Sequence, residues 1–101
     1  MPVPPQNVRE AAQRALDIRR ELPPSRRAGT PVGVKRAVDL SRGANISKST
    51  LMRMKSYLLR AREDYLNARK QGKNIETSKA IQAYYLWGAS AALAWVRSEL
   101  D

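Results

Sequence analysis

The chain of 101 residues contains no cysteine and no histidine. Without cysteine it forms no disulfide and offers no thiolate to a metal ion, which fits a reducing compartment or a virus particle. Without histidine it lacks the commonest general base and the commonest metal ligand. We therefore expect neither a metal nor a cofactor.

Other catalytic patterns are missing as well. The sequence has no glycine-rich phosphate loop followed by Lys-Ser/Thr and no nucleophile elbow. Its one adjacent carboxylate pair is Glu63-Asp64. Neighbouring residues on a helix point about 100° apart, so this pair does not form a site by itself. The sequence predicts a protein that is not an enzyme.

Phenylalanine is also absent, so two Trp, four Tyr and three Met must supply the bulk of the core. A chain of this length makes one domain. The longest apolar stretch, residues 80–96, has 17 residues, which is the short limit for crossing a bilayer. Gln82, Gly88 and Ser90 interrupt it. We predict a buried helix here and no membrane partner.

Positive charge dominates what the sequence does contain. Lys and Arg number 19 against nine Asp and Glu, a net charge of +10. The segment from Arg19 to Lys48 contains eight basic residues and only two acidic residues, Glu21 and Asp39, which gives it a net charge of +6. Clustered positive charge repels itself, and a polyanionic partner is its usual explanation. We predict that this surface contacts a polyanion, with nucleic acid as the first candidate, whether DNA or RNA. The predicted binding residues are Arg19, Arg20, Arg26, Arg27, Lys35, Arg36, Arg42, Ser47, Lys48, Arg53 and Lys55.

The spacing of apolar residues predicts an all-α fold, a compact bundle of about four helices. Residues 1–5 form an extended, proline-rich lead-in, and residues 6–101 form the single helical domain. The first helix covers about 6–22 and stops at a proline pair, which a basic loop over 23–29 follows. The other helices are expected over about 31–41, 48–70 and 76–99.

The ends of the second and third helices carry recognisable capping residues. Thr30 followed by Pro31 is a favoured start for the second helix. Gly43 suits the left-handed position just past its end. Ser47 is expected to cap the third helix, although the hydroxyls and free N–H groups at Ser47–Thr50 also suit an anion. Both roles remain open at this point.

The third helix has two apolar sides. One side carries Leu51, Met54 and Leu58, and the other carries Met52, Leu59 and Leu66 at intervals of seven residues. A helix packed on two sides explains this pattern, with basic side chains lying along the seam. The alternative is that Met52, Leu59 and Leu66 meet a partner chain. We favour packing within the chain.

In the fourth helix, Gly88 begins a run of small residues that continues through Ala89, Ser90, Ala91 and Ala92. Glycine inside a helix costs about 1 kcal/mol relative to alanine, so a close approach by another helix, here the third, is predicted. Trp87 and Trp95 flank the small residues and are predicted to anchor the core. Stacking of a nucleic-acid base on a Trp or Tyr is the alternative.

The second and third helices do not match a standard helix-turn-helix. Such a motif joins its helices by about three or four residues. The connection over 42–46 is longer, and Asp39 falls where a small residue should pack. We predict a looser arrangement in which the 23–36 region and the start of the third helix contact phosphates.

A longer pattern resembles a small helical domain of tailed-bacteriophage proteins. Its strings are Gly29-Thr30-Pro31-Val32-Gly33, Arg36-Ala37, Leu40, Gly43, Ser47, Thr50, Arg53-Met54, Ser56-Tyr57, Leu86-Trp87-Gly88 and Trp95. In such sequences a His-Glu-Val-Asp-like stretch typically follows the third helix, whereas residues 59–64 here lack histidine. The resemblance implies a phage origin and a helical module, and it brings no biochemical role with it.

These observations predict a non-catalytic phage-type module that acts in the host cytoplasm during infection or in the virion. One alternative is a virion component, such as a minor head or cement protein, whose proline-rich N-terminus lies on a neighbouring subunit. Another is an inhibitor of a host protein.

Overall fold

The computed structural model describes residues 2–101, and within them it contains helices and no strand. The all-α prediction is therefore confirmed. The elements in chain order are α1 (Gln6–Glu21), the 3₁₀ turn η1 (Pro24–Arg26), α2 (Pro31–Ser41), α3 (Lys48–Lys70), α4 (Lys79–Leu86) and α5 (Ala89–Leu100).

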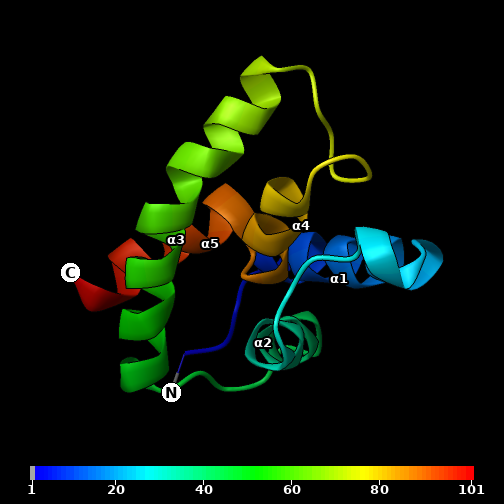
Figure 1. The fold of residues 1–101 in the computed structure, drawn as a ribbon. Helices are drawn as coiled ribbons and strands as arrows, with labels where there is room; N and C mark the ends of the chain where they lie inside the picture. Colours follow the sequence, from blue (N-terminus) through cyan, green and yellow to red (C-terminus); the bar gives the residue numbers. More distant parts are fainter. Residues whose placement is uncertain (1) are drawn as a thin grey trace.

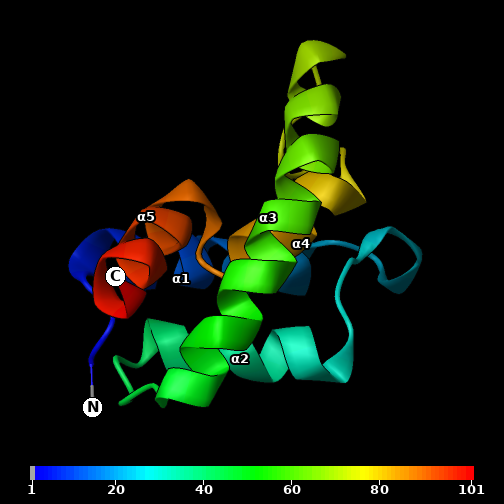
Figure 2. The same cartoon turned by 90° about the vertical axis from the view of Figure 1, so that its left-hand side faces the viewer.

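Helices α4 and α5 lie in the middle of the fold, with α1 packed on one side of them and α3 on the other. Helix α1 packs on α2, α4 and α5, and α3 packs on α4 and α5. Figures 1 and 2 show the C-terminal end of α3 extending well beyond the other helices. The molecule measures 35 × 25 × 21 Å, with a Cα radius of gyration of 12.6 Å. That radius is close to the value of about 13 Å expected for a folded chain of about 100 residues.

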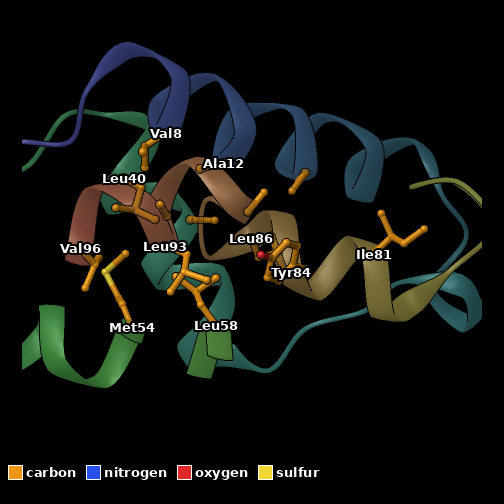
Figure 3. Packing of buried hydrophobic residues seen from close by; sticks show 14 of the residues in the cluster. Val8, Ala12, Leu40, Met54, Leu58, Ile81, Tyr84, Leu86, Leu93 and Val96 are labelled. Atoms are coloured by element: carbon orange, nitrogen blue, oxygen red, sulfur yellow. The ribbon is translucent and has the colours of Figure 1, made fainter. Parts of the chain in front are cut away.

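The core lies where these helices meet. In Figure 3, Val8 and Ala12 of α1 lie above side chains of α2, α4 and α5, and Met54 and Leu58 of α3 lie below them. The largest fully buried side chain is Tyr84, whose hydroxyl lies 3.0 Å from Ser90 Oγ. A tyrosine thus fills the place that phenylalanine often takes, because its buried hydroxyl has a partner.

The predicted starts of the second and third helices are confirmed. Thr30 Oγ1 accepts a hydrogen bond from the Gly33 N–H at 3.1 Å, and Ser47 Oγ accepts one from the Thr50 N–H at 3.2 Å. Gly43 follows α2 with a φ of 71°, in the left-handed region that glycine tolerates. Local side-chain chemistry therefore sets the ends of α2 and α3.

The single fourth helix predicted over 76–99 is wrong, because this region forms two helices. Asn74 Oδ1 accepts hydrogen bonds from the N–H groups of Glu76 and Thr77, at 2.9 and 3.1 Å. This turn delays the helix until Ser78, whose hydroxyl caps α4. Helix α4 ends at Leu86, and Gly88 has a φ of 94°, so the chain changes direction before α5 begins.

A close approach occurs at Gly88, but α3 does not make it. A Cβ atom at this position would lie 2.9 Å from Val8 Cγ1 on α1 and 2.5 Å from Ala92 Cβ. Both distances are below ordinary van der Waals contact. Glycine is therefore required twice here, once for the backbone angle and once for the space beside α1.

Two-sided packing of α3 is also wrong. Leu51, Met54 and Leu58 are buried, but the Met52, Leu59 and Leu66 residues are 55%, 43% and 39% exposed. Among the described residues, helix α1 packs on α2, α4 and α5 and makes at most minor contact with α3, so it does not cover this side of α3. We name these three residues the α3 stripe.

The proline-rich lead-in packs on its own domain. The Ile46 N–H donates a hydrogen bond to the Pro2 carbonyl at 2.9 Å, and Pro4 is fully buried. None of the helices within residues 2–101 has both the length and the apolar character that a bilayer crossing needs.

Candidate nucleic-acid interface

Most of the positive charge has no carboxylate beside it. Among residues 2–101 the ion pairs are Arg20–Asp17 at 4.0 Å, Lys35–Asp39 at 3.2 Å and Arg36–Asp39 at 3.7 Å. Each pair lies within one helix. The excess charge is therefore left to counter-ions or to an anionic partner.

Two of the predicted basic side chains are hydrogen-bonded to backbone carbonyls. Arg19 Nε donates to the Ala28 carbonyl at 3.3 Å, and Arg27 Nε donates to the Leu22 carbonyl at 2.8 Å. These bonds hold the segment after η1 against the end of α1. Buried Gln82 of α4 holds the same segment, accepting from the Ala28 N–H at 2.9 Å and donating to the Arg26 carbonyl at 3.3 Å.

Arg36 lies largely inside the protein. Its side chain is 15% exposed, and its guanidinium carbon lies 5.7 Å from the centre of the Trp87 ring. Its Nε atom is buried without a hydrogen-bond partner. This cation therefore lies between the indole of Trp87 and the carboxylate of Asp39 and supports the position of Trp87.

Two adjoining hollows lie between α2, α3 and α4, and together we name them the basic groove. Their volumes are ≈ 510 and ≈ 450 Å³, and both are lined by Thr30, Tyr57 and Trp87. The first is also lined by Met52, Arg53, Ser56 and Arg60. The second is also lined by Arg27, Ala28, Gly29, Gly33, Lys79, Ala80, Ala83 and Leu86.

Four cations border the basic groove, and no carboxylate does. Arg53 and Arg60 line the first hollow, and Arg27 and Lys79 line the second. The sequence predicted Arg27 and Arg53 and missed the other two. Arg60 follows Arg53 by seven residues on the same helix, a spacing that could have indicated it. Lys79 was missed because it lies outside the basic cluster at 19–48 and the start of the third helix, from which the predicted residues were drawn.

Two aromatic rings form the centre of the groove. Tyr57 of α3 and Trp87 at the end of α4 stack with their centroids 4.3 Å apart and their planes 22° apart. Burial raises the pKa of the Tyr57 hydroxyl, while Arg60 acts in the opposite direction. Tyr57 is therefore neutral at physiological pH and does not repel a phosphate.

The remaining predicted residues lie outside the groove. Ser47 Oγ lies 3.0 Å from Thr50 Oγ1 and 3.2 Å from Ser49 Oγ, so this cluster is occupied with capping α3. Lys48 and Lys55 line a further hollow of ≈ 440 Å³ beside Met52 and Leu59. The predicted cations that line none of these three hollows are Arg19, Arg20, Arg26, Lys35, Arg36 and Arg42.

Helices α2 and α3 do not form a helix-turn-helix. Helix α2 packs on α1 and α4, and it makes little contact with α3. Residues of the longer sequence pattern that runs from Gly29 to Trp95 nevertheless meet at one place, because many of them line the basic groove. These residues are Gly29, Thr30, Gly33, Arg53, Ser56, Tyr57, Leu86 and Trp87.

Comparison with known proteins adds no family to this picture. No family model matches the chain, and searches of curated proteins and of solved structures found no match either. Within residues 2–101, the acidic side chains form no group of three or more placed to hold a metal ion.

Proposed function

We propose that the protein is a non-catalytic helical module that binds nucleic acid in the basic groove. One observation carries this proposal: Arg53, Arg60, Arg27 and Lys79 border two adjoining hollows that no carboxylate lines. Phosphate contacts by such side chains hold a nucleic acid without reading its sequence. The N-terminus of α2 begins beside Thr30 at the same groove, and its positive dipole end adds to the attraction.

The first test measures how binding depends on salt. Four neutralised phosphates predict a slope of log affinity against log salt of about −3 to −4, depending on whether the ligand is a single strand or a duplex. Fluorescence anisotropy with a labelled oligonucleotide at several salt concentrations gives this slope. Affinity that does not change with salt would rule out the proposed function.

Charge reversals then locate the site. Arg53→Glu, Arg60→Glu and Lys79→Glu together change three exposed groove residues. The matched control is Arg14→Glu, Lys73→Glu and Arg97→Glu, whose exposed side chains line neither groove hollow. The two variants have the same net charge, because each replaces three basic residues by glutamate. We expect the groove variant to bind the oligonucleotide more than tenfold more weakly than the control variant does. Equal affinities of the two variants would show that only the total charge matters.

We further propose that the protein belongs to a phage, acting in the infected host cell or in the virion. The support is the sequence pattern whose residues meet at the basic groove. Mass spectrometry of purified particles distinguishes the two locations, because only a virion component is retained in them.

The α3 stripe favours a second candidate, a module that binds another protein. Met52, Leu59 and Leu66 are exposed apolar residues on one side of α3. Lys48, Lys55 and Asp101 border the hollow beside Met52 and Leu59, a charged edge around apolar residues that suits a protein partner, such as another phage protein or a host protein. Leu59→Asp is expected to keep the protein folded, so loss of partner binding in this variant tests the candidate.

A further inference from the structure

The aromatic pair in the basic groove is held by groups on three helices. Arg36 of α2 lies over the Trp87 ring, and Tyr57 of α3 stacks on it. A Cβ atom at Gly33 would lie 3.3 Å from Trp87 Nε1, so glycine at this position lets the indole lie against α2. The pair is therefore fixed before any ligand arrives.

The Tyr57 end of this stack borders the groove. Trp87 stacks on one face of the Tyr57 ring, and the partly exposed Tyr57 side chain lines both hollows, so a ligand in the groove can approach the opposite face of that ring. A flat ring placed there continues the series of Arg36, Trp87 and Tyr57. Stacking of a nucleic-acid base on an aromatic side chain is favourable for every base, because every base has a π-face.

The cations lie on both sides of this place. Arg53 and Arg60 border one hollow and Arg27 and Lys79 the other, while Tyr57 and Trp87 border both. A strand whose base lies on Tyr57 has phosphates before and after that base. Each of these phosphates then has two cations within the hollow that it enters.

We propose that the basic groove binds single-stranded nucleic acid, with an unpaired base stacked on Tyr57 and the flanking phosphates beside Arg53, Arg60, Arg27 and Lys79. This inference rests on the proposed function and names its ligand class. In a duplex the faces of each base are covered by its neighbours, so a duplex offers this groove its phosphates alone. A single strand offers both phosphates and bases.

The decisive experiment uses the unaltered protein and three probes. They are a single-stranded oligothymidylate, an abasic strand with the same number of phosphates, and a duplex of the same length. One stacked base predicts that the abasic strand binds about 5- to 150-fold more weakly than the oligothymidylate. Equal binding of these two strands, or tighter binding of the duplex, would overturn the inference and leave the proposed function intact. Failure to bind all three probes would overturn both.

Two substitutions locate the stacked base. Tyr57→Phe keeps an aromatic ring, whereas Tyr57→Leu keeps apolar bulk and loses the ring. We expect Tyr57→Leu to reduce the preference for oligothymidylate over the abasic strand to near unity, and Tyr57→Phe to retain it. A preference that survives in Tyr57→Leu, with circular dichroism showing the native fold, would place the base elsewhere and overturn the assignment.

Tryptophan fluorescence gives a second measurement that needs no change at Tyr57. The chain has two tryptophans, so Trp95→Phe leaves Trp87 as the single reporter. We expect the oligothymidylate to change the emission of Trp87, and heparin, a polyanion without bases, to leave it unchanged. The same change with heparin, or none with the oligothymidylate, would contradict base stacking beside Trp87.

Discussion

Gly88→Ala is expected to destabilise the protein through two separate effects. The first is the backbone angle, because a φ of 94° costs a residue with a Cβ atom about 1–2 kcal/mol. The second is space, because the new Cβ would lie 2.5 Å from Ala92 Cβ and 2.9 Å from Val8 Cγ1. Overpacking of this kind costs about 1–3 kcal/mol. A less flexible unfolded chain offsets about 0.4–1 kcal/mol of the total.

Gly72→Ala is the matched control. Gly72 has a φ of 78°, and a Cβ atom there would meet nothing within 4 Å. This variant therefore carries the backbone effect alone, a net loss of about 1 kcal/mol. The free energy of unfolding of Gly88→Ala should fall by about 1–3 kcal/mol more than that of the control.

Thermal unfolding followed by circular dichroism measures the difference. For a domain of this size, about 1 kcal/mol shifts the melting temperature by about 4–8 °C. We expect Gly88→Ala to melt at least about 4–8 °C below Gly72→Ala. If the two variants have the same melting temperature, the neighbouring atoms of α1 do not limit the space at position 88.

Two further predictions concern adjacent leucines and the tyrosines. Leu58 is 0% exposed, so Leu58→Asp should abolish the cooperative melting transition. Leu59 is 43% exposed, so Leu59→Asp should leave the free energy of unfolding within about 0.5 kcal/mol of its original value. A Leu59→Asp chain that unfolds would show that the α3 stripe is covered. Burial raises the pKa values of Tyr57 and Tyr85 above 10.0, with Tyr65 adding to the shift at Tyr85, so the folded protein keeps these protons to higher pH than the unfolded chain does. Their contribution to stability is complete below pH 10 and is lost as the pH rises through the folded pKa values. Melting temperatures measured up to that range should fall less in the variant that combines Tyr57→Phe and Tyr85→Phe, and an equal fall would assign the loss to other groups.

The sequence predicted the first three helices well because short-range chemistry fixes them. The proline pair at 23–24 ends α1, and the Thr30 and Ser47 hydroxyls cap α2 and α3. Each of these signals acts within a few residues of where it stands. The predicted helix ends therefore agree with the structure to within one residue.

The division between α4 and α5 could not be predicted in the same way. Glycine at position 88 is compatible with a small-residue helix contact and with a left-handed break, and the two differ only in the backbone angle. The open side of α3 was missed because the sequence does not show where α1 packs. The basic groove joins Tyr57 to Trp87 across 30 positions, so no periodicity along the chain indicates it.

Gln82 attaches the segment that contains Arg27 to helix α4. Its side-chain amide joins α4 to the backbone of Arg26 and Ala28, two residues far away in the sequence. Figures 1 and 2 show this connecting segment passing beside α4 on its way into α2. These hydrogen bonds tie the segment that carries Arg27 to α4, which begins at Lys79, so the two cations lie on directly connected parts of the molecule. A loop that is already ordered loses little conformational freedom when a ligand arrives, so more of the attraction between charges is left for affinity.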